Sequence, residues 1–266
     1  MNLLLDKLTR FCIRYLQKVK YYIWTRKHKL KNIERLLSFR KKYQNRRCFI
    51  LGNGPSLLKC DLSLLKNEIT IASNANFLIW DKMGFSPSFL TVEDNLVAED
   101  RSKDLSKISS TVKIFPEDLL YCLKPDENTI FLNFKRNYEG FPKFSEKFEE
   151  VVYWGGTVSY LNLQLAYFLG CTEIYLIGFD HSYHVPDKSK ISNFVITSQE
   201  DDVNHIHPDY FGKGYRWHDP MLWRMEMAYE KAKDFFIKQN ISIFNSTVGG
   251  SLEIFERKDY KELFNK

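Results

Sequence analysis

The chain has 266 residues, 44% of them hydrophobic and 15% aromatic, which is enough for one large α/β domain or two small ones. Its five cysteines are scattered and form no Cys-x-x-Cys pair, so neither a disulfide framework nor a zinc site is indicated, and a reducing cytoplasm fits best. No apolar run is long enough to span a bilayer. The net charge of +6 is uneven, because residues 1–47 hold 15 Lys/Arg against two acidic residues and the remainder is acidic.

The N-terminal region has the pattern of a basic amphipathic helix. Apolar residues recur at helical spacing over residues 3–24, and lysines and arginines fill much of the rest. This pattern suits an anionic membrane surface, which we expect residues 3–29 to contact. A helix packed on the domain and a nucleic-acid arm are the alternatives, and we expect no nucleic acid partner. Charges interrupt the apolar stretch, which argues against a signal peptide.

The motif Gly52-Asn53-Gly54-Pro55-Ser56 directly follows the apolar run 48–51. It predicts a buried strand, a tight turn and the start of a helix, with glycines that allow positive φ and close backbone approach. Backbone N–H groups at such a turn can bind a phosphate, so we interpret the motif as the first βα turn of a nucleotide-binding sheet. Leu57 stands where a dinucleotide motif has its third glycine, and an ordinary glycine-rich turn is the alternative.

Further apolar runs predict strands at 68–74, 87–94, 111–116 and 129–134, followed by a loop or small helix at 135–152. The first of these strands ends at Asn74 and the second at Glu93 and Asp94. The C-terminal ends of strands form the ligand crevice of an open parallel sheet, so these polar ends predict a binding site.

A second glycine-rich motif, Gly155-Gly156-Thr157, opens an apolar helix predicted at 157–170. Thr157 can cap that helix and Gly170 can end it. A strand follows at 171–180 and again ends in polar residues, with Gly178 and Asp180. The order of elements predicts a mostly parallel, doubly wound α/β sheet.

Residues 181–220 contain five of the six histidines and show little periodicity. A segment of this length is typical of a functional lid, and its aromatic residues argue against disorder. His205 and His207, with Asp201 and Asp202, are candidates for a divalent metal site, although no strong metal spacing is present. The alternative for each histidine is a surface or turn position.

The remaining elements are a helix at 220–239, a strand at 241–246 and a short C-terminal helix within 251–266. Phe255, Tyr260 and Phe264 are expected to dock that last helix. We divide the chain into a basic segment, 1–47, and a main domain, 48–266, which includes the lid at 181–220.

The glycine motifs, Asn74 and the run Leu169-Gly170-Cys171-Thr172-Glu173-Ile174-Tyr175-Leu176-x-Gly178-x-Asp180 resemble bacterial sialyltransferases of glycosyltransferase family 42. They also resemble the wider superfamily of the 6-hydroxymethylpterin diphosphokinase MptE-like domain, formerly domain of unknown function 115. The resemblance covers roughly residues 48–250. It implies a Rossmann-like fold, a CMP-activated nine-carbon sugar as donor, a histidine base, and neither a metal nor a resident cofactor.

Site residues follow from this resemblance. We expect His218 to be the catalytic base and Tyr183 to lie near the donor phosphate. The expected substrate-binding residues are Gly52, Asn53, Gly54, Ser56, Asn74, Glu93, Asp94, Gly155, Gly156, Thr157, Gly178, Asp180, His205 and His207.

The sequence departs from the sialyltransferase pattern in three places, one of which is the segment 205–210, for which those enzymes have no clear counterpart. Tyr153-Trp154-Gly155 stands where those enzymes carry an arginine before the threonine, and Tyr183 remains of a tyrosine pair. Another nucleotide sugar, such as another CMP-linked keto-acid sugar, is therefore an alternative donor.

The resemblance and the charge pattern together predict a glycosyltransferase of bacterial surface polysaccharide or lipooligosaccharide synthesis. We expect it to be cytoplasmic, peripheral at the inner membrane face, and to act on a glycan or lipid-linked acceptor. One alternative is Mg²⁺-dependent pyrophosphoryl transfer to a pterin, with Glu93, Asp94 and Asp180 as metal ligands. The other is a non-catalytic, membrane-recruited nucleotide-binding module.

Overall fold

An eight-stranded sheet runs through the centre of the protein, whose computed structural model describes residues 19, 28–184, 190–192 and 195–265. Its strand order is β13-β12-β8-β1-β2-β3-β4-β5, and every pairing in it is parallel. The predicted Rossmann-like α/β fold is thus confirmed. The strands are β1 (Arg47–Leu51), β2 (Ile69–Ser73), β3 (Phe89–Thr91), β4 (Val112–Pro116), β5 (Thr129–Leu132), β8 (Glu173–Ile177), β12 (Ser242–Asn245) and β13 (Glu256–Arg257).

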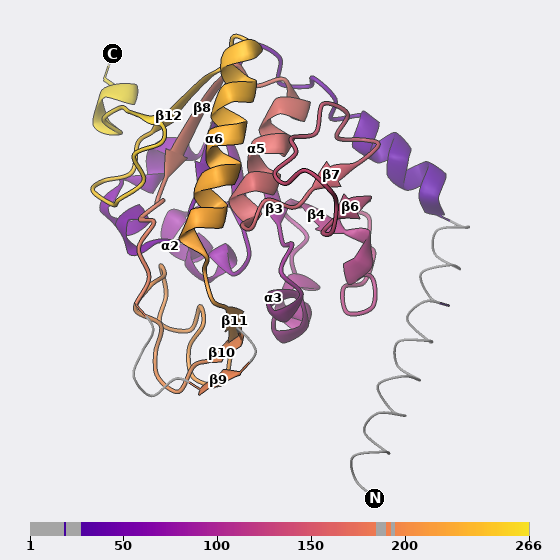
Figure 1. The fold of residues 1–266 in the computed structure, drawn as a ribbon, viewed down its shortest axis with the longest axis vertical. Coiled ribbons are helices and arrows are strands. Elements are labelled where there is room, and N and C mark those ends of the chain that lie inside the picture. Colours follow the sequence, from indigo (N-terminus) through magenta and orange to yellow (C-terminus); the bar gives the residue numbers. More distant parts are fainter. Residues whose placement is uncertain (1–18, 20–27, 185–189, 193–194, 266) are drawn as a thin grey trace, which may run out of the picture.

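Both faces of the sheet are covered. On β1, Cys48 and Ile50 pack in a core with the long helices α5 (Val158–Leu169) and α6 (Leu222–Lys238), which lie across one face in Figure 1. The alternate residues Phe49 and Leu51 pack in the core on the other face. Strands buried on both sides are continuous apolar runs, which is why the sequence predicted them.

Short helices cover the second face. They connect the successive strands from β1 to β5, so that side of the sheet has no long helix among the described residues. These elements are η1 (Pro55–Lys59), η2 (Leu62–Leu65), η3 (Asn76–Ile79), α2 (Trp80–Met83), α3 (Asn95–Asp100), α4 (Ser102–Leu105) and η4 (Glu117–Leu119); η5 (Lys261–Leu263) lies near the C-terminus.

The strand order reverses beside β1. The chain proceeds from β1 to β5 in one direction, then returns to place β8 and β12 on the other side of β1. In open α/β sheets, ligands bind outside the C-terminal ends of the strands at such a switch point. The topology therefore places the candidate site where β1 and β8 end.

The lid region contains a small sheet that the sequence did not predict. Strands β9 (Lys190–Ser192), β10 (Val195–Thr197) and β11 (Arg216–His218) pair antiparallel, below α6 and beside α3 in Figure 1. Another short ribbon joins β6 (Phe134–Lys135) to β7 (Val152–Tyr153) in the segment predicted as irregular. Two or three residues are too few to show a strand period.

Residues 28–37 form a helix that contacts the edge of the sheet. The Asn32 side-chain amide donates to the Phe131 carbonyl of β5, and its oxygen accepts from the Phe131 N–H, both at 2.8 Å. The predicted amphipathic helix at 3–24 lies outside the described residues except for Val19, and the domain boundary at 47 stays a prediction. Among the described residues, no helix combines the length and apolarity needed to cross a membrane.

Candidate active site

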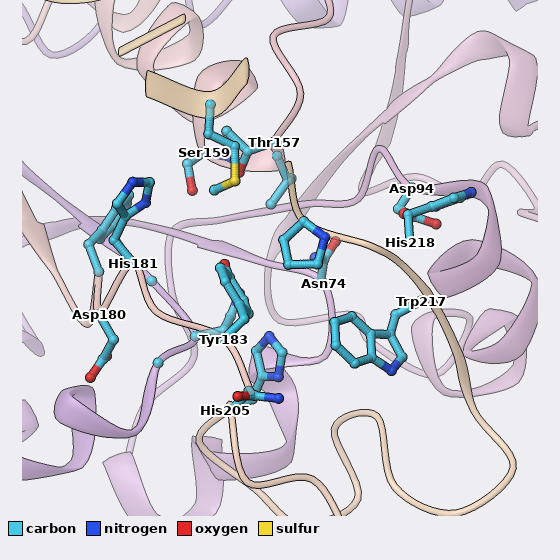
Figure 2. A pocket seen from close by; sticks show the side chains of 18 of the residues that line it. Asn74, Asp94, Thr157, Ser159, Asp180, His181, Tyr183, His205, Trp217 and His218 are labelled. Carbon is cyan, nitrogen blue, oxygen red and sulfur yellow. The ribbon is translucent and has the colours of Figure 1, made fainter. Parts of the chain in front are cut away.

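A cavity of about 170 Å³ opens at the C-terminal ends of β1, β2, β3 and β8, as the topology requires. Its other walls are the N-terminus of α5 and residues from the segment 181–220, and Figure 2 shows the side chains that face it. Most of the residues expected from the sequence meet here. They are Gly52, Asn53, Gly54, Asn74, Glu93, Asp94, Gly156, Thr157, Gly178, Asp180, Tyr183, His205 and His218.

The turn after β1 is fastened to the turn after β8. The N–H groups of Gly52 and Gly54 donate to the carbonyls of Ile177 (2.7 Å) and Gly178 (3.0 Å). A β-carbon on Gly52 would lie 2.2 Å from the Gly178 oxygen, so this glycine is needed for close approach. Neither Gly52 nor Gly54 uses the positive φ that a glycine allows, whereas Gly178 has φ +76°.

Several backbone N–H groups of this first turn are used within the protein, and a phosphate site here stays a prediction. Besides those two N–H groups, the Ser56 N–H donates to the Asp180 carboxylate at 3.3 Å and the Ser56 hydroxyl donates to it at 2.6 Å. The helix that follows, η1, is a five-residue 3₁₀ helix. Ser56 is buried behind the cavity, which corrects its assignment as a substrate contact.

Asn53 and Asn74 have different surroundings. The Asn53 side chain donates to the Ser73 hydroxyl at 3.0 Å and accepts from the Asn76 amide at 3.2 Å, so it shapes the crevice floor. Asn74 has a left-handed backbone with φ +54°. Its side-chain oxygen is buried and has no hydrogen-bond partner among the described residues, which leaves it available to a ligand.

The N-terminus of α5 contributes backbone and hydroxyl groups. Gly156 has φ +83°, and the Thr157 hydroxyl caps the helix by accepting from the Ser159 N–H at 3.3 Å. The Tyr229 ring from α6 faces the same space, and burial raises its pKa to about 12. Gly155 does not line the cavity, because it packs against the Tyr160 ring, where an added β-carbon would be 2.2 Å away.

His218 is the last residue of β11 and lies beside Asp94, which follows β3. Its Nδ1 is 2.7 Å from an Asp94 carboxylate oxygen, and its side chain is 45% exposed. The hydrogen bond to Asp94 raises the pKa of His218 above its usual value, although burial opposes it. A carboxylate only accepts, so neutral His218 carries its proton on Nδ1 and leaves Nε2 as a proton acceptor.

Asp94 and Glu93 are themselves held in place. The Asp94 carboxylate caps α3 by accepting from the N–H groups of Leu96 and Val97 at 2.7 and 3.3 Å. Burial raises the pKa of Glu93 to about 7. The Arg136 guanidinium, which donates a hydrogen bond to Glu93 at 3.1 Å, opposes this shift. The pKa values of both Glu93 and His218 are therefore raised in this corner of the cavity.

Two further histidines line the cavity, each beside a carboxylate. His205 Nδ1 is 2.7 Å from Asp202, and His181 Nε2 is 3.0 Å from Glu226. His207 does not line the cavity, because its ring turns back to accept from the Asp209 N–H at 3.1 Å. His181 and Tyr229 line the cavity although they were not predicted from the sequence, and no local motif marks them or Glu226, the partner of His181.

Part of the lid is attached to α3 and to Arg101, the residue that follows it. Arg216 donates to Glu99 at 2.9 Å and to Asp100 at 3.2 Å. Arg101 donates to the Asp209 and Tyr210 carbonyls. These contacts make the part of the lid around β11 a wall of the cavity.

The carboxylates that a Mg²⁺ site would need are used for other contacts. Glu93 pairs with Arg136, Asp94 with His218, and Asp180 with Ser56. In the described part of the chain, no group of three or more His, Cys, Asp or Glu side chains is placed to hold a metal ion.

A parallel α/β sheet with a polar crevice at its switch point is an architecture of nucleotide-binding proteins. The family model described as 6-hydroxymethylpterin diphosphokinase MptE-like matches residues 24–185, more than half of the chain, so the chain belongs to this family. The structure of the MAf glycosyltransferase from Magnetospirillum magneticum AMB-1 is similar over 86% of this chain, with 16% identity and a TM-score of 0.51. This chain spans 38% of that one, and the likeness shows the fold. No curated protein matches the sequence.

Proposed function

We propose that the protein is a glycosyltransferase that transfers a sugar from a nucleotide-activated donor. The observation that carries this proposal is the His218–Asp94 pair at the mouth of a crevice built at the switch point of a parallel sheet. An oriented imidazole with a free Nε2 is a suitable general base for an acceptor hydroxyl. The family membership and the fold shared with a glycosyltransferase support the same class.

The proposed reaction uses the two sides of the crevice. His218 Nε2 takes the proton of the acceptor hydroxyl, whose oxygen attacks the anomeric carbon of the donor sugar. The bond from that carbon to the phosphate oxygen breaks, and the nucleotide leaves with the electron pair. The positive end of α5, at Gly156 and Thr157, faces the cavity and suits an anionic group of the donor, either a phosphate or a sugar carboxylate.

For the donor, we propose a CMP-linked sialic-acid-like or other keto-acid sugar, used in surface polysaccharide or lipooligosaccharide synthesis. The support is the set of glycine and Gly178-x-Asp180 motifs that resemble family 42 sialyltransferases. The missing arginine before Gly155 leaves the sugar open within this class. The description of the family model names the rival pterin diphosphokinase, but the carboxylates that its Mg²⁺ would need make other contacts here.

The first prediction concerns nucleotide binding. One compound among CMP, CDP, UDP and GDP is expected to stabilise the protein by about 2.7 kcal/mol when present at about 100 times its Kd. Because the proposed transfer needs no metal, adding EDTA should leave this stabilisation unchanged. Thermal unfolding with and without EDTA measures both. No stabilisation by any of the four would contradict the proposal, and stabilisation that requires Mg²⁺ would favour pyrophosphoryl transfer.

We also propose that the basic N-terminal region holds the protein at an anionic membrane surface. Within the described residues, Leu30 is 79% exposed between exposed Lys29 and Lys31, and Leu37 is 41% exposed. The second prediction is therefore co-sedimentation with vesicles that contain anionic lipid, weakened by salt because each lysine near such a surface contributes about 1 kcal/mol. Equal binding to neutral vesicles, or none to anionic ones, would refute it.

A further inference from the structure

A second histidine–aspartate pair lies in the same crevice. His205 Nδ1 is 2.7 Å from the Asp202 carboxylate, and the two side chains are only 10% and 3% exposed. The ring of His205 lines the cavity, and its Nε2 has no hydrogen-bond partner among the described residues. The reaction outlined above gives this pair no part.

The aspartate of the pair is fixed before any ligand binds. Its carboxylate accepts from the N–H of Phe211 at 2.9 Å and from the N–H of Asn204 at 2.8 Å. The imidazole of His205 is a third hydrogen-bond partner of this buried carboxylate. Asp202 therefore fixes the position of His205 Nδ1, which leaves Nε2 as the ring atom that can meet a ligand.

The ring itself is held by aromatic packing. His205 stacks on Tyr210 with ring centroids 4.2 Å apart and planes 6° apart, and the Phe211 ring meets it edge-on at 5.1 Å. The Tyr183 ring lies on its other side at 6.1 Å. With its plane set by these contacts and Nδ1 set by Asp202, the direction of Nε2 is determined as well.

The two histidine–aspartate pairs lie near the C-terminal ends of different strands. The N–H of Ile206, next to His205, donates to the Asn53 carbonyl at 2.9 Å, which attaches His205 to the turn after β1. His218 is attached through Asp94 to the end of β3. Figure 2 shows the two imidazoles well apart, with Asn74 and Trp217 between them. His205 thus lies on the side of the β1 turn and Tyr183, and His218 lies on the opposite side.

We propose that His205, oriented by Asp202, is a catalytic residue that contacts the leaving phosphate of the nucleotide donor. This inference rests on the function proposed above. As the bond between the anomeric carbon and the phosphate oxygen breaks, its electron pair passes to that oxygen, and His205 donates a hydrogen bond to it from a protonated Nε2. The proton of the acceptor goes to His218. The crevice therefore has one imidazole for the acceptor and another for the leaving group.

The test compares two histidines of one loop. His205→Gln removes the positive charge beside the phosphate, whereas His207→Gln changes a ring that turns away from the cavity. With whichever of CMP, CDP, UDP or GDP stabilises the wild type, calorimetric titration should show about 10- to 100-fold weaker binding for His205→Gln, the range for a hydrogen bond to a charged group. Binding by His207→Gln should match the wild type.

Asp202→Asn provides a second measurement if His205→Gln does not fold. It is expected to weaken nucleotide binding in the same direction, because the ring loses its charged partner. Wild-type affinity in a folded His205→Gln or Asp202→Asn variant would overturn this inference alone. Failure of the wild type to bind any of the four nucleotides would overturn the proposed function as well.

Discussion

Replacing His218 with glutamine is expected to lower kcat for sugar transfer by about 10²- to 10⁴-fold, the usual contribution of a general base. Glutamine has no group that takes up a proton near neutral pH, so the acceptor hydroxyl loses its activation. His218 is 45% exposed and lies at a strand end, so the fold should not change. Affinity for the free nucleotide should also stay at the wild-type value, because His218 faces the acceptor. Steady-state kinetics combined with calorimetry separates these two effects.

The pH dependence provides the control for this assignment. The base works when neutral, and the Asp94 hydrogen bond raises the pKa of His218, so kcat/KM should fall as the pH drops through a value above 6.5. Asp94→Asn keeps an oxygen to cap α3 but removes the charge, so the acidic limb should move to lower pH. Glu93 and Arg136, which also face this ring, are unchanged in the variant. Near wild-type turnover in His218→Gln, or an acidic limb that Asp94→Asn does not move, would contradict the role of His218.

Replacing Gly52 with alanine is expected to lower the free energy of unfolding by about 3 kcal/mol or more, at the upper end for overpacking. The added β-carbon would lie 2.2 Å from the Gly178 oxygen and 2.9 Å from the Phe179 ring. The nearest of these atoms is backbone, so the turns after β1 and β8 must separate. Urea unfolding measures the loss from the shift of the midpoint at constant slope.

Gly249→Ala is the matched control. Gly249 has φ +76°, and nothing lies within 4 Å of an added β-carbon, so alanine there meets only backbone strain of about 1 kcal/mol. Gly52 has the opposite properties, because its φ is not positive and there is no space for an added β-carbon. Equal losses in the two variants would show that close approach of the two turns is not what Gly52 supplies.

The sheet was predictable because its signals are local. A strand such as β2, which is buried along its whole length, is a short and mostly apolar run that ends in polar residues. The sheet of the lid left no such signal. Strand β10 pairs with β11 about twenty residues further along, and each has only three residues. Pairings of this kind depend on tertiary contacts, such as that between Arg216 and Asp100.

The candidate site was also predictable only in part. Strand ends and helix caps brought Asn74, Asp94 and Thr157 together as the sequence indicated. The partners of His218 and His181 were hidden, because Asp94 and His218 are 124 positions apart and Glu226 is 45 positions from His181. The Asp202–His205 spacing was visible but was interpreted as a possible metal site.

The Asn32 side chain has a consequence for how copies of the protein meet. Strand β5 is the last of its sheet, and an uncovered edge strand is a template on which another chain can add by backbone pairing. By bonding both backbone groups of Phe131, Asn32 occupies positions that an incoming strand would need. The segment before β1 thus protects this edge of the sheet from edge-to-edge aggregation.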